Sequence, residues 1–198
     1  MVHVLVIDLY NLNIYNDIIE INLKHHKITH ETVRYDKFNT IDFNKYTHII
    51  LTGSDYYISN GQIVLSKGQI YTLLGTKKPI LAQCYAFQLL AHYLCGSKTC
   101  VKLFRKKHNG FLKIDSPLVK PNSLYYVNHY NYVDYLNENW NIISKKTIRD
   151  IDGTRKTFIM DAYMKDFPVL CLQYHPESSI ENYDFIKKWI DNSLSVYI

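Results

Sequence analysis

The segment around Cys84 contains the first pattern that could support chemistry. An apolar run over residues 79–83 gives way to helical spacing, and Cys84 stands at the junction, with the small residues Ala82 and Ala86 two positions to either side. A nucleophile elbow needs this arrangement, because the sharp strand-to-helix turn leaves room only for small flanking side chains. The N-terminus of the following helix would favour the thiolate form of the cysteine. By itself, the pattern is equally typical of a buried cysteine that starts a core helix.

A second reactive pattern is His175-Pro176-Glu177, which ends an apolar run that begins at residue 169. Residues i and i+2 of an extended segment point to the same side, and Pro176 biases the residue before it toward extended geometry. A carboxylate beside an imidazole orients the ring and stabilises its charged form, as general acid–base chemistry requires. Taken alone, the tripeptide is also typical of a loop turn around a hydrogen-bonded histidine.

The elements around these residues follow the alternation of a parallel α/β protein. Short β-branched runs predict strands at residues 2–8, 32–35, 47–52, 79–83 and 169–174. Helical spacing predicts helices at residues 12–23, 67–74, 87–94 and 180–190. This order predicts a flavodoxin-like, doubly wound and mostly parallel sheet with flanking helices. Cys84 and His175 each follow a strand, so both are expected at the carboxyl edge of the sheet, where such folds bind ligands.

The pattern changes after Gly96 to short runs separated by turn residues. The runs lie at residues 113–115, 125–127, 141–145 and 157–161, and Asp152-Gly153 is a typical two-residue turn between the last two. This stretch predicts a small antiparallel β insertion. With 198 residues and no linker or internal repeat, the chain is expected to form a single domain over residues 1–198.

Composition and charge exclude several classes of protein. The chain has 47% hydrophobic and 21% charged residues, which is ordinary for a globular protein and excludes disordered and fibrous classes. The net charge is +5, and the sequence has no nucleic-acid-binding motif, so we expect a solvated basic face and no nucleic-acid partner. The densest basic cluster comprises Lys102, Arg105, Lys106, Lys107 and His108.

The cysteines give an expectation about the compartment. Four cysteines without C-x₂-C spacing argue against both a disulfide framework and a structural zinc site. Cys95, Cys100 and Cys171 are therefore predicted to be packing cysteines of a cytoplasmic protein in a reducing compartment. The apolar run at residues 2–8 is too short for a signal peptide or a membrane span, so we expect no membrane association.

We expect no metal and no cofactor. His25, His26 and His30 lie in a polar turn without a matching set of cysteines or carboxylates, which is typical of surface histidines. The chain has no glycine-rich phosphate-binding loop and is not expected to bind a nucleotide.

Together, PILAQCYAFQLL (79–90) and LQYHPES (172–178) resemble the class I glutamine amidotransferases in motif, order and spacing. The most similar branch contains the glutaminase components of GMP synthetase and anthranilate synthase. The resemblance implies that Cys84 attacks the side-chain amide of L-glutamine, forms a γ-glutamyl thioester and releases ammonia. His175 would give and take the proton, and Glu177 would orient the His175 ring. A separate synthetase subunit would receive the ammonia.

The resemblance also implies further site residues. The backbone N–H of Tyr85 and one from the loop at Gly53 and Ser54 would hold the oxyanion. Four residues are weaker candidates for binding the substrate: Gln88, Asn128, His129 and Asp55.

Several positions depart from the family pattern. Alanines at 82 and 86 replace the elbow glycines, Gln83 replaces an aliphatic residue, and Ser54 and Asp55 replace a glycine and a proline of the oxyanion loop. These departures leave two alternatives open. One is a hydrolase with the same triad that acts on γ-glutamyl peptides, γ-glutamyl conjugates or protein glutamine side chains. The other is a catalytically silent binding or regulatory homologue.

Overall fold

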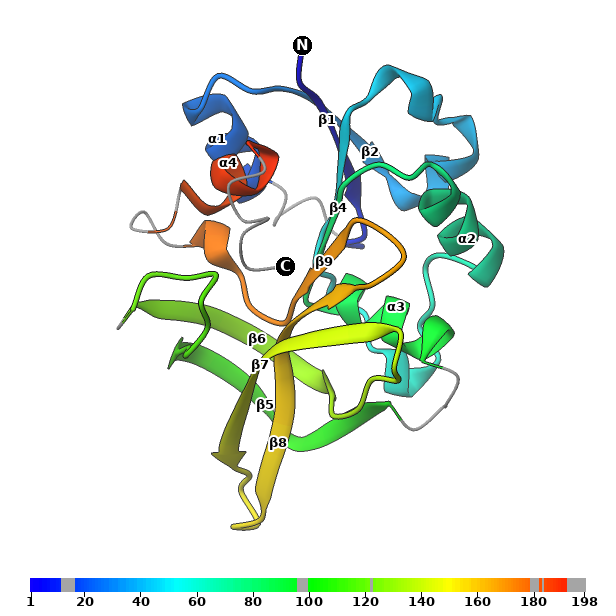
Figure 1. Cartoon of the computed structure of the whole chain (residues 1–198). Helices are drawn as coiled ribbons and strands as arrows, with labels where there is room; N and C mark the ends of the chain where they lie inside the picture. The colour runs from blue at the N-terminus through cyan, green and yellow to red at the C-terminus, as the bar shows by residue number, and fades with distance from the viewer. Residues whose placement is uncertain (12–16, 96–99, 122, 179–181, 183, 192–198) are drawn as a thin grey trace.

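The computed structural model describes residues 1–11, 17–95, 100–121, 123–178, 182 and 184–191 (Figure 1). Its main element is a seven-stranded sheet with the order β2-β1-β3-β4-β9-β8-β7. The first five strands in this order are parallel: β2 (Thr29–Arg34), β1 (His3–Asp8), β3 (His48–Leu51), β4 (Ile80–Gln83) and β9 (Val169–Leu172). The other two pair antiparallel: β8 (Arg155–Met164) and β7 (Trp140–Arg149).

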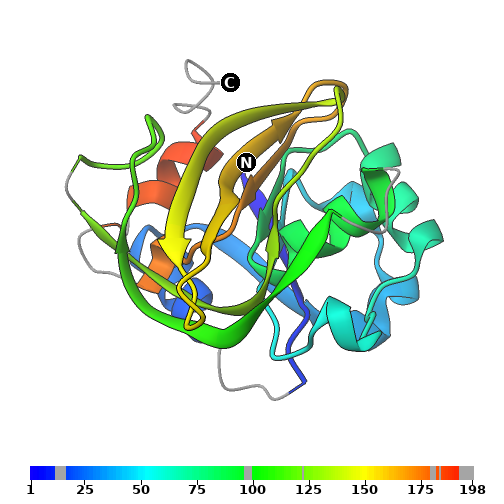
Figure 2. The same cartoon turned by 90° about the horizontal axis from the view of Figure 1, so that it is seen from below.

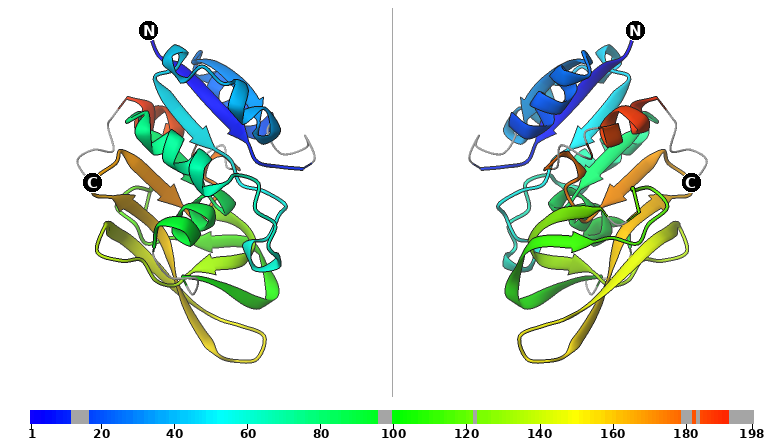
Figure 3. Two further views of the ribbon diagram at one scale, coloured as in Figure 1. Left: turned by 90° about the vertical axis from the view of Figure 1, so that its right-hand side faces the viewer. Right: turned by 90° about the vertical axis from the view of Figure 1, so that its left-hand side faces the viewer.

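Helices cover both faces of the parallel part of the sheet (Figures 1 and 3). On one face lie α2 (Lys67–Gly75) and α3 (Tyr85–Leu94). On the other face lie α1 (Asp17–His25) and α4 (Asp184–Ile190). The predicted flavodoxin-like, doubly wound fold is confirmed.

Strand β1 shows why the parallel strands read as continuous apolar runs. Leu5 and Ile7 pack into the core under α2 and α3, and Val4 and Val6 pack into the core under α1 and α4. Successive side chains of a strand point to opposite faces, so a strand covered on both sides has no polar alternation.

The predicted antiparallel part divides between two sheets. Strands β5 (Val101–Lys113) and β6 (Leu124–Val133) form a separate two-stranded sheet, seen in green in Figure 2. Strands β7 and β8 instead extend the main sheet, and the predicted Asp152-Gly153 turn joins them, with Gly153 at a φ of 78°. Short 3₁₀ turns complete the described fold: η1 (Tyr35–Thr40), η2 (Phe43–Lys45), η3 (Ile58–Asn60) and η4 (Pro176–Ser178).

Several predicted boundaries need correction, for example the strand predicted at residues 32–35, which is β2 at Thr29–Arg34. The strand predicted at residues 113–115 is wrong, because β5 ends at Lys113 and begins twelve positions earlier. Phe104 is the one buried side chain of β5, basic residues follow it at 105–108, and the pairing register shifts between Leu103 and His108, so the strand has no apolar run. The helix predicted from residue 87 begins at Tyr85, directly after the elbow. The predicted helix stop at Gly96, and the parts of predicted helices at residues 12–16, 180, 181 and 183, lie outside the described residues.

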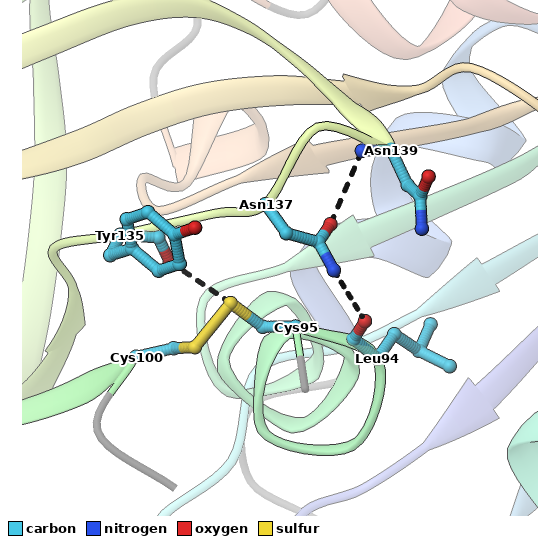
Figure 4. Close-up of a disulfide and its surroundings, with 6 residues drawn as sticks. All are labelled: Leu94, Cys95, Cys100, Tyr135, Asn137 and Asn139. Atoms are coloured by element: carbon cyan, nitrogen blue, oxygen red, sulfur yellow. Dashed lines mark hydrogen bonds between the residues drawn. A yellow bond between two sulfur atoms is a disulfide. The ribbon is translucent and has the colours of Figure 1, made fainter. Parts of the chain in front are cut away.

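The prediction that Cys95 and Cys100 are packing cysteines is wrong. They form a disulfide, with a Cα–Cα distance of 6.7 Å, that joins the end of α3 to the residue before β5 (Figure 4). Sequence spacing does not reveal whether two Cβ atoms approach closely enough for a disulfide. Cys171, in contrast, is a free buried cysteine of β9, as a packing role requires. The cysteine pattern therefore gives no support for a reducing compartment.

Candidate active site

Cys84 occupies a sharp turn between β4 and α3. Its φ and ψ are 49° and −104°, a backbone conformation that residues other than glycine rarely adopt. The Cys84 N–H donates a hydrogen bond of 2.6 Å to the carbonyl of Leu172 at the end of β9. Ala82 and Ala86 are completely buried on either side of the turn, which explains why larger side chains would not fit. This backbone has the strained geometry of a nucleophile elbow.

His175 and Glu177 lie together beside Cys84, at the carboxyl end of β9. The His175 Nδ1 donates to Glu177 Oε1 over 2.9 Å, and both side chains are buried. The His175 N–H donates to the carbonyl of Tyr126 over 3.0 Å, which ties this segment to β6. Burial alone would lower the pKa of His175, but the Glu177 carboxylate and a hydrogen bond to the Cys84 side chain raise it instead. The arrangement therefore favours the imidazolium beside the cysteine.

A buried glutamine extends this arrangement by one residue. Gln83, the last residue of β4, donates from Nε2 to Glu177 Oε2 over 2.8 Å. The two carboxylate oxygens of Glu177 thus accept from different partners, Gln83 and His175. Sequence reasoning noted Gln83 only as a departure from the family pattern and gave it no role.

A second buried glutamine contacts the sulfur and was missed from the sequence. Gln173 Nε2 lies 3.6 Å from Cys84 Sγ, within hydrogen-bonding distance for sulfur. Gln173 Oε1 accepts from Gln88 Nε2 over 3.3 Å, and the same Gln88 nitrogen donates to the carbonyl of Asn131 over 2.8 Å. The available signal was the spacing, since Gln173 precedes His175 by two residues at the end of an extended segment.

Gly53 brings the loop after β3 against the candidate triad. A Cβ atom at this position would lie 2.7 Å from Tyr10 Oη and 3.0 Å from His175 Cε1, so a larger residue would have to displace one of these side chains. Within the described part of the chain, neither the N–H of Gly53 nor the N–H of Tyr85 at the start of α3 donates a hydrogen bond. These two groups are therefore available to hold an oxyanion.

The Ser54 side chain has a different partner. Its hydroxyl donates to the carbonyl of Leu9 over 2.7 Å and accepts from the N–H of Tyr56, which fixes the loop to the end of β1. The next residue, Asp55, accepts from the N–H of Asn11 through Oδ1 over 2.8 Å.

Asn128, His129 and Gln88 are the expected substrate-binding residues of β6 and α3, and they differ in their contacts around Cys84 Sγ. The carbonyl oxygen of Asn128 lies 4.0 Å from Cys84 Sγ. His129 is buried and bonds the carbonyl of Asn131 through Nδ1 over 2.7 Å, and burial lowers the pKa of His129 to about 3, so its ring is neutral. Gln88 is buried, and its amide nitrogen is already used by the bonds described above.

Two cavities adjoin these residues. A cleft of about 300 Å³ lies over His175 and Glu177 and is also lined by Asp55, Lys107 and Phe111, among others. A much smaller cavity of about 10 Å³ lies against Cys84 and Tyr85. Ser54, Tyr57 and Asn128 line both cavities. The first has the size of a small ligand pocket, and the second has room for about one water molecule or a single oxygen atom.

Membrane-spanning helices and metal clusters are absent from the described residues. No helix in the described part of the chain is long and apolar enough to cross a membrane. No group of three or more histidine, cysteine, aspartate or glutamate side chains in the described ranges is arranged to hold a metal ion.

Comparison with protein families identifies the class to which this fold and site correspond. Residues 5–193 match the family described as Glutamine amidotransferase class-I. The chain belongs to this family. A comparison with curated proteins finds no match.

Several solved structures share the fold of this chain. A GMP synthase subunit from Thermoplasma acidophilum aligns with a TM-score of 0.74 and 16% identity, over 99% of this chain and 96% of that one. PurLQS from Thermotoga maritima aligns with a TM-score of 0.68 and 15% identity, over 98% and 100%. A glutamine amidotransferase from Thermotoga maritima aligns with a TM-score of 0.64 and 16% identity, over 98% and 84%. At these identities the likeness concerns the fold.

Proposed function

We propose that this chain, as a single domain, hydrolyses the side-chain amide of L-glutamine through a γ-glutamyl thioester on Cys84 and supplies the ammonia to a separate synthetase subunit. The observation that carries the proposal is the hydrogen bond of His175 to Glu177 beside the strained elbow at Cys84, where a Cβ atom on Gly53 would lie 3.0 Å from His175 Cε1 and 3.5 Å from Cys84 Cβ. Membership of the class I family supports glutamine as the substrate. The structural neighbours described as a GMP synthase subunit and as PurLQS support a synthetase partner.

In the first half of the reaction, the Cys84 thiolate attacks the γ-carbonyl carbon. The N–H groups of Tyr85 and Gly53 hold the negative oxygen that develops, and the small cavity beside Cys84 has room for that one atom. The C–N bond then breaks, and the imidazolium of His175 gives its proton to the departing nitrogen, which leaves as ammonia.

In the second half, the thioester is hydrolysed. Neutral His175 takes a proton from water, which attacks the same carbonyl carbon. The C–S bond breaks, glutamate leaves, and Cys84 returns as a thiolate beside the imidazolium. Glu177 holds His175 in the required orientation throughout, and Gln83 holds Glu177.

The test is release of ammonia and glutamate from L-glutamine by the purified chain, beside Cys84→Ser and Cys171→Ala. Cys171 is the other free cysteine and lies in β9, so its replacement controls for loss of a buried thiol. We expect release by the wild type and by Cys171→Ala and none by Cys84→Ser. Release that persists in Cys84→Ser would overturn the proposal. Failure of a glutamine-mimicking chloroketone to label Cys84 would favour the silent homologue.

A further inference from the structure

The cleft over His175 is larger than L-glutamine requires. Pockets that bind drug-sized ligands have volumes of about 300–1,000 Å³. The cleft has about 300 Å³, whereas L-glutamine is much smaller than a drug-sized ligand. The site therefore has room for a substrate that extends beyond the amide nitrogen of glutamine.

The position of the cleft matters as much as its size. In the proposed mechanism His175 gives its proton to the departing nitrogen, so the leaving group lies on the side of the site that His175 faces. His175 and Glu177 line the large cleft, whereas Cys84 and Tyr85 line the small cavity. A substituent on the amide nitrogen would therefore project into the large cleft, and the carbonyl oxygen would point into the small one.

Part of the lining of the cleft comes from β5 and β6. The Tyr126 ring lies 6.1 Å from the His175 ring, and the Phe111 ring lies 5.7 Å from the Tyr126 ring, measured between centroids. Phe111 is 60% exposed, although it is a large apolar side chain. These two rings provide an apolar contact surface that begins at the proton donor.

The part of the lining that comes from β5 also includes a cation. Lys107 of β5 lines the cleft, and among the described residues it forms no ion pair. Its neighbour Lys106 is more exposed and is not among the residues that line the cleft. The loop after β3 also lines the cleft, and there Asp55 uses Oδ1 for the Asn11 N–H. Among the described residues no hydrogen bond to Asp55 Oδ2 is formed, so this oxygen can accept from a ligand. The lining of the cleft thus includes a negative group from the loop after β3 and a positive group from β5, together with His175.

We propose that the cleft accepts γ-glutamyl amino acids with an aromatic or other large apolar side chain as further substrates. Such a molecule has an ammonium group and a carboxylate at its glutamyl end, an amide in the middle and a second carboxylate at its other end. Lys107 binds the second carboxylate, Phe111 and Tyr126 contact the apolar side chain, and Asp55 binds the ammonium group. The inference rests on the proposed function, because it uses the same Cys84 chemistry.

The reaction balances in the same way as glutamine hydrolysis. Cys84 attacks the γ-carbonyl carbon, the C–N bond breaks, and the amino acid leaves with a proton from His175 as its free amine. Water then cleaves the thioester and frees glutamate. The net reaction consumes one water and yields glutamate and one amino acid, with no oxidant or other co-reactant.

The test compares three substrates: L-glutamine, γ-glutamyl-phenylalanine and γ-glutamyl-phenethylamide, which has the same ring but no carboxylate. Each is assayed with the wild type, Lys107→Met and the matched control Lys106→Met. We expect the wild type to hydrolyse the dipeptide. We expect Lys107→Met to lower kcat/KM for the dipeptide by about tenfold, which corresponds to about 1.4 kcal/mol, and to leave the other two substrates unchanged. Lys106→Met should match the wild type on all three.

The outcomes separate the two proposals. Hydrolysis of glutamine without hydrolysis of the dipeptide would overturn this inference and leave the proposed function standing. Hydrolysis of the dipeptide that Lys107→Met does not weaken would overturn the assignment of Lys107. Silence on all three substrates, with no labelling of Cys84 by the chloroketone, would overturn the proposed function and this inference with it.

Discussion

Gln83 and Glu177, which are 94 positions apart in the chain, are joined by a hydrogen bond of 2.8 Å between two buried side chains. The other oxygen of Glu177 accepts from His175, so the orientation of the imidazole depends on a carboxylate held from both sides. This relationship arises because β4 and β9 are adjacent and in register, with Gln83 opposite Leu172. It makes Gln83 a positioning residue that acts through Glu177.

Replacement of Gln83 tests this role. Gln83→Met removes the donor to Glu177, and a hydrogen bond to a charged group contributes about 1.5–3 kcal/mol. We expect kcat for glutamine to fall by about tenfold or more, with KM nearly unchanged, because Gln83 does not touch the substrate. The free energy of unfolding should change little. The substitution loses the hydrogen bond to Glu177, but it also removes the buried Gln83 Oε1, which has no hydrogen-bond partner among the described residues. Steady-state kinetics and denaturant unfolding measure the two effects.

Gln83→Glu supplies the matched variant. It places a carboxyl group beside Glu177, and two adjacent carboxylates disfavour simultaneous ionisation. Its activity should therefore be lowest at alkaline pH and partly recover as the pH falls. Equal kcat values for the wild type and Gln83→Met across the pH range would refute the positioning role.

The pKa of His175 predicts how stability depends on pH. Its pKa in the folded protein is raised by Glu177 and Cys84 above its ordinary value of about 6.5. The charged His175 therefore stabilises the folded state fully below a pH of about 6.5, and this stabilisation is lost as the pH rises through the pKa of His175 in the folded protein. Glu177→Gln weakens this effect, so it should cost more stability at pH of about 6 than at pH of about 9. Urea unfolding of the wild type and of Glu177→Gln at the two pH values measures the difference in the free energy of unfolding. An equal difference at both pH values would count against the His175–Glu177 ion pair.

The space around Gly53 predicts a local loss of function. A Cβ atom there would meet Tyr10 Oη and His175 Cε1 at 2.7 Å and 3.0 Å, so Gly53→Ala must displace one of them. A displaced imidazole or oxyanion loop should lower kcat by about 10²-fold or more. Gly68→Ala in α2 is the control, because the nearest atom to its Cβ is 3.9 Å away. The idea fails if both alanine variants keep wild-type turnover.

The contact between Gln173 and Cys84 predicts the reactivity of the thiol. The Gln173 amide donates to Sγ over 3.6 Å and would stabilise the thiolate. Gln173→Met should slow alkylation of Cys84 by chloroacetamide severalfold at neutral pH. The measurement is made in a Cys171→Ala background, so that Cys84 is the sole free thiol outside the disulfide. An unchanged alkylation rate would show that the amide does not support the thiolate.

Sequence reasoning predicted the parallel half of the fold well, for a physical reason. Strands β1, β3, β4 and β9 are covered on both faces, so each reads as a short apolar run, and the elbow and His-Pro-Glu patterns lie at the ends of two of them. The antiparallel half was harder. Strand β5 has one buried side chain, Phe104, and contains a register shift, so its length did not show in the sequence.

Within the site, the residues predicted from the sequence belong to the elbow and His-Pro-Glu motifs. The residues whose roles were missed belong to no motif that the sequence shows. Gln83 and Gln173 are buried polar residues whose roles depend on partners distant in sequence, and pairing of this kind is set by sheet register. The Cys95–Cys100 disulfide was missed for a similar reason, because it depends on how closely the end of α3 approaches the start of β5. Lys107 was one residue of a basic cluster and Phe111 belonged to no motif, and both became notable only because β5 lines the cleft.

The most direct test of the central claim is to look for the thioester itself. The chain is mixed with L-glutamine, quenched in acid within the first turnovers and analysed by intact mass and peptide mapping. We expect a γ-glutamyl adduct on Cys84, present in the wild type and in Cys171→Ala and absent from Cys84→Ser. Ammonia release with no adduct on Cys84, or with an adduct on a different residue, would contradict the proposed mechanism.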